Sequence, residues 1–190
     1  MGFSFHSEQW LPHPVEAVFA FFADPENIAV LMPPWQKARI EKMTIVPPSK
    51  SAPTAGLAVV AAGVGTRVTV SFLPFRHAPF RIRWEAEITE FGWNTHFADR
   101  QVRGPFAYWD HAHRLRAIDR EGLNVTLIVD HIDYDVPYGV LGKLAHNLFL
   151  RRKIAALFAF RQSEVARVFS EIKPKTPQSH PKMMNPAATA

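Results

Sequence analysis

Residues 139–173, GVLGKLAHNLFLRRKIAALFAFRQSEVARVFSEIK, decide the fold of this chain. The stretch contains no proline, and Pro137 and Pro174 enclose it, so about thirty residues can form one helix. At 1.5 Å per residue that helix would be roughly 45 Å long. Apolar residues recur in it at intervals of three, four and seven, which is typical of a helix with a buried face. They are Leu141, Leu144, Leu148, Ala155, Phe158, Val165 and Phe169, with a second line at Ala145, Phe149, Ile154, Leu157 and Phe160.

Such a helix can bury its apolar surface only against a curved partner, and the chain before it supplies strands. Residues 66–72 and 80–88 alternate apolar with polar side chains, which is typical of an antiparallel sheet solvated on one face. We predict an α+β fold: a seven-stranded curved antiparallel sheet around the long C-terminal helix, with two short helices between strands 1 and 2. The predicted strands are 3–10, 38–46, 66–72, 80–88, 96–103, 107–118 and 124–136; the short helices are 15–23 and 24–31, and 47–65 is a long loop.

Composition excludes several classes of function. The chain has 190 residues, of which 47% are hydrophobic, so it suits one domain with a real core, residues 1–172, followed by a disordered tail, 173–190. The absence of cysteine excludes disulfides and thiolate metal sites. Three lysines of the +5 net charge lie in the tail, so the rest is nearly neutral and no nucleic-acid partner is expected. No stretch is apolar enough to span a bilayer or to act as a secretory signal, and a cytoplasmic location is expected.

The predicted strand 107–118 carries the residues that are best suited to catalysis or to ligand binding. Side chains alternate along a strand, so Trp109, His111 and His113 share one face. If the hairpin at 119–122 closes on residues 120 and 121, His111 pairs with Asp130, and Tyr134 lies on the same face. Asp99 and Gln101 share a face of the preceding strand, which is expected to be the same face. The sequence therefore predicts a polar cluster within an otherwise apolar pocket; its members are Asp99, Gln101, His111, His113, Asp130 and Tyr134.

This cluster is open to three chemical interpretations. A buried His–Asp pair can act as a general base, with Tyr134 as a hydrogen-bond donor to a developing enolate. Alternatively, the groups satisfy one another and anchor the polar end of a ligand without turnover, which is the favoured interpretation. Two histidines two residues apart could share a metal ion with Asp99 or Asp130. No short-spaced ligand motif supports that third interpretation, so the sequence predicts no metal and no cofactor.

Several strings, taken in order along the chain, resemble the SRPBCC superfamily, the START-like or helix-grip group that includes polyketide cyclase/dehydrase-type domains. The resemblance is nearest to the small bacterial cyclase/dehydrase-like branch. It implies the sheet and helix described above and a deep hydrophobic cavity between them, in a single START-like ligand-binding domain. It implies no single activity, because carriers, receptors and enzymes share the fold. The strings are SEQWLP at 7–12, VFAFFADPEN at 18–27, PPW at 33–35, QVRGPF at 101–106, WDHAH at 109–113 and DHIDYDVP at 130–137.

The leading hypothesis is therefore a carrier or sensor that binds a lipid-, polyketide- or quinone-like molecule with one polar end. One alternative is a cyclase or dehydratase that acts on a polyketide-like substrate through His111, His113, Asp130 and Tyr134. Another is an accessory protein that docks on an oxidoreductase or on a membrane surface; the sequence names no protein partner. The residues expected to contact the ligand are Trp84, Asp99, Gln101, Trp109, His111, His113, Asp130, Tyr134, Leu144, Leu148, Ala155 and Phe158.

Overall fold

The computed structural model describes residues 2–49, 60–120 and 123–171. Seven strands form one antiparallel sheet in the order β1-β7-β6-β5-β4-β3-β2, which confirms the predicted sheet. The strands are β1 (Phe3–Leu11), β2 (Arg39–Thr44), β3 (Arg67–Phe72), β4 (Ile82–Gly92), β5 (His96–Arg103), β6 (Tyr108–Arg120) and β7 (Leu123–Asp135). Residues 50–59 of the predicted loop and the predicted tail 173–190 lie outside the described residues.

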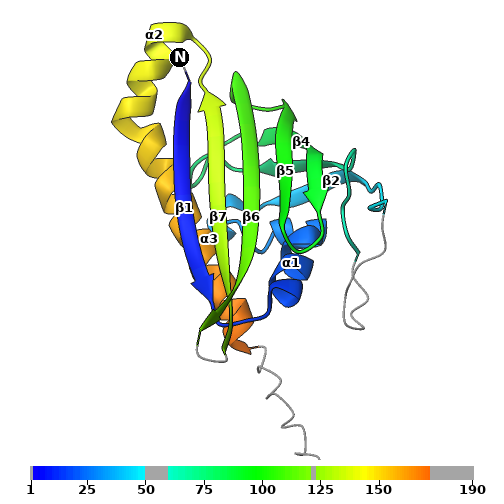
Figure 1. Ribbon diagram of the computed structural model, residues 1–190. Coiled ribbons are helices and arrows are strands. Elements are labelled where there is room, and N and C mark those ends of the chain that lie inside the picture. The colour runs from blue at the N-terminus through cyan, green and yellow to red at the C-terminus, as the bar shows by residue number, and fades with distance from the viewer. Residues whose placement is uncertain (1, 50–59, 121–122, 172–190) are drawn as a thin grey trace, which may run out of the picture.

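The helices lie at the two ends of the sequence. Between β1 and β2 the chain forms α1 (Val15–Ala23) and two short 3₁₀ helices, η1 (Pro25–Ile28) and η2 (Pro34–Gln36). After β7 it forms α2 (Gly139–Ala145), a π-helical turn η3 (His146–Leu150) and α3 (Arg151–Glu171). The long C-terminal helix is therefore confirmed, with a π-helical turn that the sequence did not predict. Figure 1 shows it beginning beside the N-terminal end of β1 and passing behind β1 and β7.

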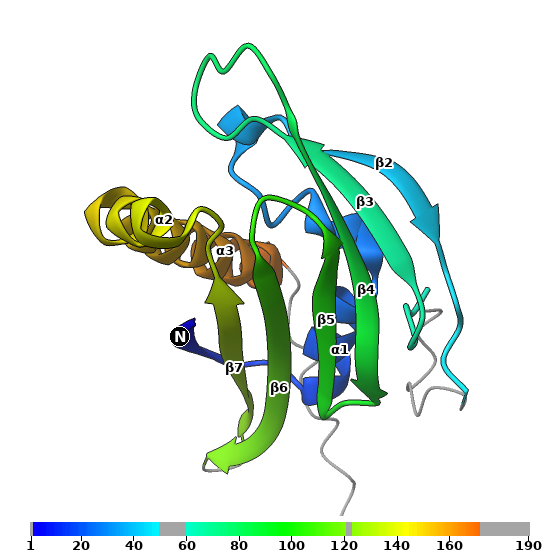
Figure 2. The same cartoon turned by 90° about the horizontal axis from the view of Figure 1, so that it is seen from above.

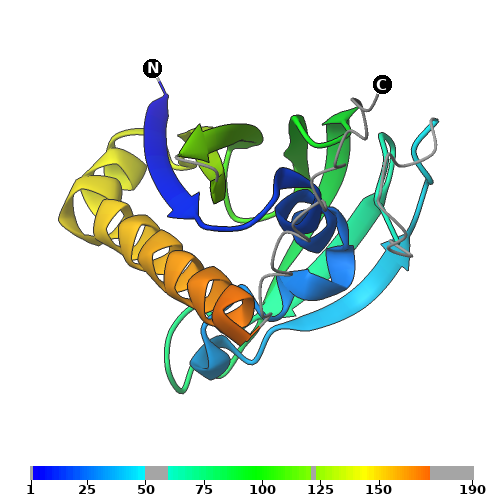
Figure 3. The same cartoon turned by 60° about the horizontal axis from the view of Figure 1, so that its bottom comes forward.

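The sheet is bent, and both α1 and α3 lie on the inner side of the bend (Figures 2 and 3). The alternation of side chains explains this arrangement: Val68 and Val70 of β3 are buried, whereas Arg67 points outward and hydrogen-bonds Glu87 of β4 at 2.8 Å. The pairing of β2 with β3 shifts register between Ile40 and Lys42, which is typical of a β-bulge. One apolar face therefore lines the inside of the bend.

The second half of the C-terminal helix holds the fold together from the inside. Val165 and Phe169 join the core cluster formed by β1, α1, β6 and β7, and Ile154 and Phe158 join a second cluster further along the helix. Hydrogen bonds between side chains and backbone also join α3 to β1. Gln9 of β1 donates to the carbonyl of Gln162 at 2.8 Å, and Gln162 donates back to the carbonyl of Glu8 at 3.0 Å.

The first half of this helix behaves differently from the prediction. Leu144 and Leu148 are 55% and 62% exposed, and Ala155 is exposed as well, so these residues do not face the sheet as predicted. The side that faces the sheet carries His146, which is buried, and the half-buried Leu150. Leu148 is two positions from each of these residues, which is roughly opposite on a helix. The buried stripe thus continues from Phe158 through 154 and 150 to 146, in steps of four.

Gly142 explains how α2 can follow β7 so closely. A Cβ at this position would collide with the carbonyl oxygen of Pro137, which belongs to the connection from β7. Only glycine leaves room for the backbone to turn back at this point. The glycine therefore fixes where the C-terminal helix starts, although it lies within the helix.

The two halves of the helix should differ sharply in their contribution to stability. Phe169→Ala removes a ring that is 2% exposed, and we expect it to lower the free energy of unfolding by about 3–5 kcal/mol. Leu148→Ala should change it by no more than about 0.5 kcal/mol, because this side chain is mostly in solvent. Urea denaturation followed by circular dichroism measures both values. A large loss for Leu148→Ala would show that the first half of the helix is packed in solution.

Candidate functional site

The register of β6 with β7 brings the histidines of the predicted cluster next to Asp130, but it corrects which histidine lies opposite that residue. The structure pairs His113 with Asp130, His111 with Ile132 and Trp109 with Tyr134. The prediction that His111 lies directly opposite Asp130 is therefore wrong by two residues, because the strands are paired up to Arg120 and Leu123. A shift of two keeps every side chain on its predicted face, whereas a shift of one would have turned Asp130 outward.

Asp130 is the centre of this cluster. Its Oδ1 lies 3.1 Å from Nε2 of His111, in a hydrogen bond, and 2.7 Å from Nδ1 of His113. The second contact is close but poorly aligned, so Nδ1 of His113 has no full hydrogen bond. The other carboxylate oxygen accepts a long hydrogen bond of 3.4 Å from Ser7 of β1. One carboxylate therefore orients both imidazole rings.

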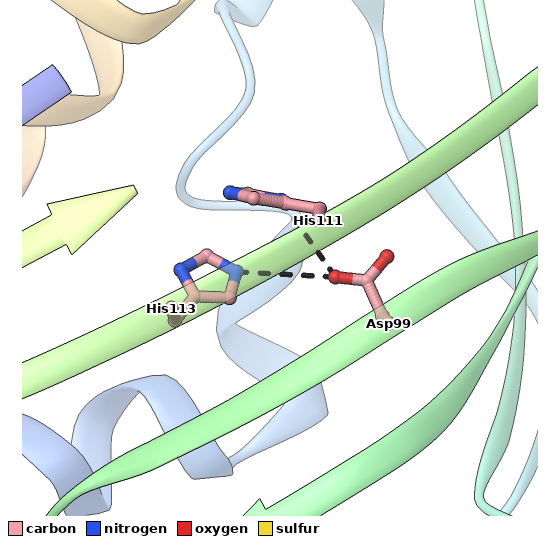
Figure 4. A group of neighbouring side chains, drawn as sticks. All are labelled: Asp99, His111 and His113. Atoms are coloured by element: carbon pink, nitrogen blue, oxygen red, sulfur yellow. Dashed lines mark ion pairs between the residues drawn. The ribbon is translucent and has the colours of Figure 1, made fainter. Parts of the chain in front are cut away.

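Asp99 lies on the other side of the two rings. It pairs with His111 in the β5–β6 register, so it faces inward as predicted. Its Oδ2 lies 3.7 Å from Nδ1 of His111 and 3.9 Å from Nε2 of His113 (Figure 4). These distances are too long for hydrogen bonds. The nitrogens nearest Asp99 therefore face its carboxylate without being bonded to it.

The cluster is a polar layer between two apolar ones. On β6 and β7, Leu115 and Ile128 belong to one core cluster, and Trp109 and Ile132 belong to the other. Aromatic rings cover both histidines. Phe97 stacks on His113 with ring centroids 4.2 Å apart, and Phe158 of α3 lies edge-on to His111 with ring centroids 5.5 Å apart. Both histidines are 3% exposed. Their polar atoms must therefore find partners within the protein or in a bound species.

The electrostatics of the layer follow from this burial. Burial, reinforced by the charge of His113, lowers the pKa of His111 to about 3. Burial also raises the pKa of the Asp99 carboxyl to about 6. Burial alone would raise the pKa of Asp130 too, but the charge of His113 and the contacts with both imidazoles hold that pKa well below its usual range. His111 is therefore neutral at pH 7, and an imidazole with so low a pKa is a weak general base there.

Two predicted members of the cluster are engaged elsewhere. The side chain of Gln101 donates to the carbonyl of Phe106 at 2.9 Å and so orders the turn between β5 and β6. The hydroxyl of Tyr134 hydrogen-bonds Nε2 of His146 at 2.8 Å. The structure therefore brings together Asp99, His111, His113 and Asp130, but neither Gln101 nor the Tyr134 hydroxyl.

Trp84 and Trp109, two of the residues predicted to contact a ligand, form an aromatic wall together with Phe106. The rings of Trp84 and Trp109 meet edge-to-face with centroids 5.0 Å apart, and Phe106 lies 5.5 Å from Trp84 and 4.7 Å from Trp109. Phe158 completes this side of the site from the helix. Four residues of the helix were predicted to contact the ligand. Only Phe158 of these faces the sheet, because Leu144, Leu148 and Ala155 are exposed.

Sequence reasoning missed three residues that shape the site. Ser7 bonds Asp130, and the alternation of β1 already placed it on the inner face. His146 is buried and stacked on Phe3 with centroids 3.5 Å apart; its spacing of four from 150 and eight from 154 was the available signal. Arg161 of α3 lies over the ring of Phe158 at 5.0 Å, and its charge lowers the pKa of both Asp99 and His111. No signal in the sequence distinguished Arg161 from the other basic residues of the helix.

Two hollows on the described part of the chain are open to solvent. One, of about 330 Å³, lies at Gly2, Phe3 and Ser4 beside the end of β7. The other, of about 290 Å³, lies at Thr95, His96 and Arg114 near the middle of β6. Neither is the deep space that the sequence predicted between the sheet and the helix.

Comparison with known proteins rests on structure alone, because no protein-family model and no curated protein sequence matches the chain. Norcoclaurine synthase from Thalictrum flavum superposes with a TM-score of 0.58 at 12% identity, covering 90% of this chain and 88% of that one. The chain has the same helix-grip fold. The Zhui aromatase/cyclase from Streptomyces sp. R1128 has the same fold, with a TM-score of 0.55 at 16% identity over 88% of this chain and 96% of that one.

A third protein with this helix-grip fold, Ara h 8.0201, matches with a TM-score of 0.53 at 15% identity over 88% of this chain and 99% of that one. At such identities the similarity establishes the fold and not the activity. Among the described residues, no helix is both long and apolar enough to span a membrane. What the helix-grip chain does must therefore be argued from its own site.

Asp130 should be far more important for stability than a chemically matched carboxylate on the outer face. We expect Asp130→Asn to lower the free energy of unfolding by about 2–3 kcal/mol, because it removes the charge that both buried imidazoles contact. Asp133 forms a similar 3.3 Å pair with His131 on the same strand, but its side chain is 58% exposed. Asp133→Asn should therefore change stability by less than about 0.5 kcal/mol. Equal urea midpoints for the two variants would contradict the central role of Asp130.

Proposed function

We propose that this chain binds a hydrophobic small molecule with one polar end on the inner side of its sheet. The observation that carries the proposal is the polar layer of Asp99, His111, His113 and Asp130 within an otherwise apolar inner face. A few converging polar groups among apolar and aromatic side chains are typical of small-molecule sites. The polar end would contact this layer, and the body of the molecule would lie against the aromatic wall of Trp84 and Trp109.

Structures with the same fold support a small ligand with an aromatic or polyketide-like body. One structure of norcoclaurine synthase from Thalictrum flavum, with a TM-score of 0.57 at 15% identity, is a complex with dopamine and hydroxybenzaldehyde. Another similar structure is an aromatase/cyclase. Lipid-, polyketide- and quinone-like molecules all combine an apolar body with a polar end and suit the aromatic wall equally well.

We propose that the C-terminal helix moves outward as the ligand enters. Neither the hollow beside the end of β7 nor the one near the middle of β6 is lined by a residue of the polar layer. The first half of the helix is suited to this movement because its exposed side carries Leu141, Leu144 and Leu148, which make little buried contact. The π-helical turn at 146–150 separates it from the packed second half, and such turns are frequent at functional sites. We therefore propose that ligand enters past α2 and η3.

Binding without turnover accounts for the geometry better than a cyclase or dehydratase mechanism does. Such a mechanism assigns base catalysis to His111 and His113 with Asp130, and hydrogen-bond donation to Tyr134. However, the lowered pKa makes His111 a weak base, and the hydroxyl of Tyr134 is bonded to His146. Turnover of a polyketide-like substrate that is lost in a His111→Ala/Asp130→Asn double variant would overturn this preference.

The aromatic wall gives a direct test of ligand binding. We expect 1-anilinonaphthalene-8-sulfonate, a probe with an apolar body and an anionic end, to bind the purified chain with an increase in fluorescence. Trp84→Ala should weaken binding by roughly tenfold, because it removes one side of the wall. Trp10→Ala is the matched control, since that ring is 44% exposed on the outer face. The same loss in both variants, or no binding by the unaltered chain, would contradict the proposed site.

A second observation favours membrane docking as an additional function. Most of the exposed residues of α2 and η3 are apolar, Lys143 and Asn147 being exposed as well, and the basic run Arg151-Arg152-Lys153 follows directly. No acidic residue occurs between Asp135 and Glu164. An apolar helical surface flanked by cations suits the surface of an anionic bilayer, where apolar side chains enter the headgroup region and cations face phosphates. The exposed apolar residues are Tyr138, Val140, Leu141, Leu144, Leu148 and Phe149.

Vesicle sedimentation tests the docking surface. We expect the chain to sediment with phosphatidylserine-containing vesicles at low salt and much less with pure phosphatidylcholine vesicles, because the cations contribute to binding. Leu148→Asp should reduce sedimentation severalfold, since it places a charge among the apolar side chains. Leu123→Asp is the control, because Leu123 is equally exposed at the far end of the sheet. Equal loss in both variants would exclude α2 and η3 as the docking surface.

A further inference from the structure

Three electron-rich side-chain atoms converge within the polar layer without bonding one another. Oδ2 of Asp99 faces Nδ1 of His111 and Nε2 of His113 (Figure 4), and one ligand atom from each of the three residues lies within 4.8 Å of the other two. The two distances from the carboxylate oxygen, 3.7 and 3.9 Å, are too long for hydrogen bonds. A cation in their midst could therefore contact all three atoms at once.

The spacing of these atoms suits a metal ion better than direct pairing. Imidazole nitrogens and carboxylate oxygens bind Zn²⁺ at about 2.0–2.2 Å, so ligand atoms around one ion lie roughly 3.3–3.6 Å apart in a tetrahedral site. The two distances from Asp99 exceed this spacing by only a few tenths of an ångström. Small rotations of the side chains would close them around an ion.

The opposite side of each imidazole supports the same interpretation. Nε2 of His111 and Nδ1 of His113, the nitrogens that point away from Asp99, lie 3.1 and 2.7 Å from Oδ1 of Asp130. Histidines that bind metal commonly direct their second nitrogen at a carboxylate, which fixes the tautomer and the orientation of the ring. Here one carboxylate does this for both rings, so each presents its other nitrogen to the space beside Asp99. A small rotation of His113 would also align its contact with Asp130, which lacks hydrogen-bond geometry at present.

We propose that Asp99, His111 and His113 bind one divalent transition-metal ion, with Asp130 orienting both histidines. The donor set of two imidazoles and one carboxylate suits Zn²⁺ or Fe²⁺, whereas Mg²⁺ and Ca²⁺ prefer ligands that are all oxygen. Three protein ligands leave at least one coordination position open. That position would accept water or the polar end of a molecule bound against the neighbouring aromatic wall. The metal site goes beyond the proposed ligand binding and does not depend on it.

Calorimetric titration of the full chain with ZnSO₄, after treatment with EDTA and dialysis, tests the site. We expect one Zn²⁺ per chain. Asp99→Asn should weaken binding by at least roughly tenfold, and it is expected to fold because neither contact it removes is a hydrogen bond. Asp130→Asn should weaken binding as well, because the histidines lose their orientation. The absorption bands of the Co²⁺-loaded chain should change in Asp99→Asn, which reports directly on the ligand set.

The matched control lies on the outer face of the neighbouring strands β7 and β1. His131–Asp133 and His6–Glu8 are exposed pairs, each with a 3.3 Å contact, and could bind Zn²⁺ adventitiously. His131→Gln should leave the affinity unchanged. Absence of stoichiometric binding, or loss of binding in His131→Gln but not in Asp99→Asn, would overturn the proposal. The titration uses no organic ligand, so this failure and the failure of probe binding to the aromatic wall are distinguishable.

Discussion

The contact on which the rest of this structure depends is the packing of the second half of α3 against the inner face of the bent sheet. Val165 and Phe169 are almost wholly buried there, in the same core as α1 and the middle of β6 and β7. Because successive strand residues point to opposite faces, this packing decides which side chains of every strand are shielded from water. The orientation of the site residues is a consequence of that choice.

Once the inner face is shielded, its polar residues have few ways to be satisfied. The layer of His111, His113 and the two aspartates lies between apolar clusters. Asp130 contacts one nitrogen of each imidazole ring. The other nitrogen of each ring faces Asp99 at a distance too long for a hydrogen bond. An ion placed between these atoms would contact all three, which is the arrangement that the proposed metal site requires.

The two halves of the C-terminal helix differ in how much of their apolar surface is buried. Its second half fits the core, but its first half, beyond the π-helical turn, leaves Leu144 and Leu148 in water. A contiguous exposed apolar surface is unusual in a soluble monomer and commonly marks an interaction site. Placed next to the opening through which a ligand would pass, this surface would couple docking on a bilayer to the uptake of an apolar molecule.

The sequence by itself determined the element order, the seven strands, the long helix and the inner face that carries Asp99, His111, His113 and Asp130, because alternation and helical periodicity are local properties. It placed Asp130 opposite the wrong histidine, since the register of a hairpin depends on how its turn closes. Only the tertiary structure decided that Leu148 is exposed and that Gln101 bonds Phe106 instead of the cluster. The exposure of Leu148 depends on the π-helical turn and on how the helix packs on the sheet, and the bond of Gln101 depends on how the turn between β5 and β6 folds. The pattern of apolar and polar residues encodes neither.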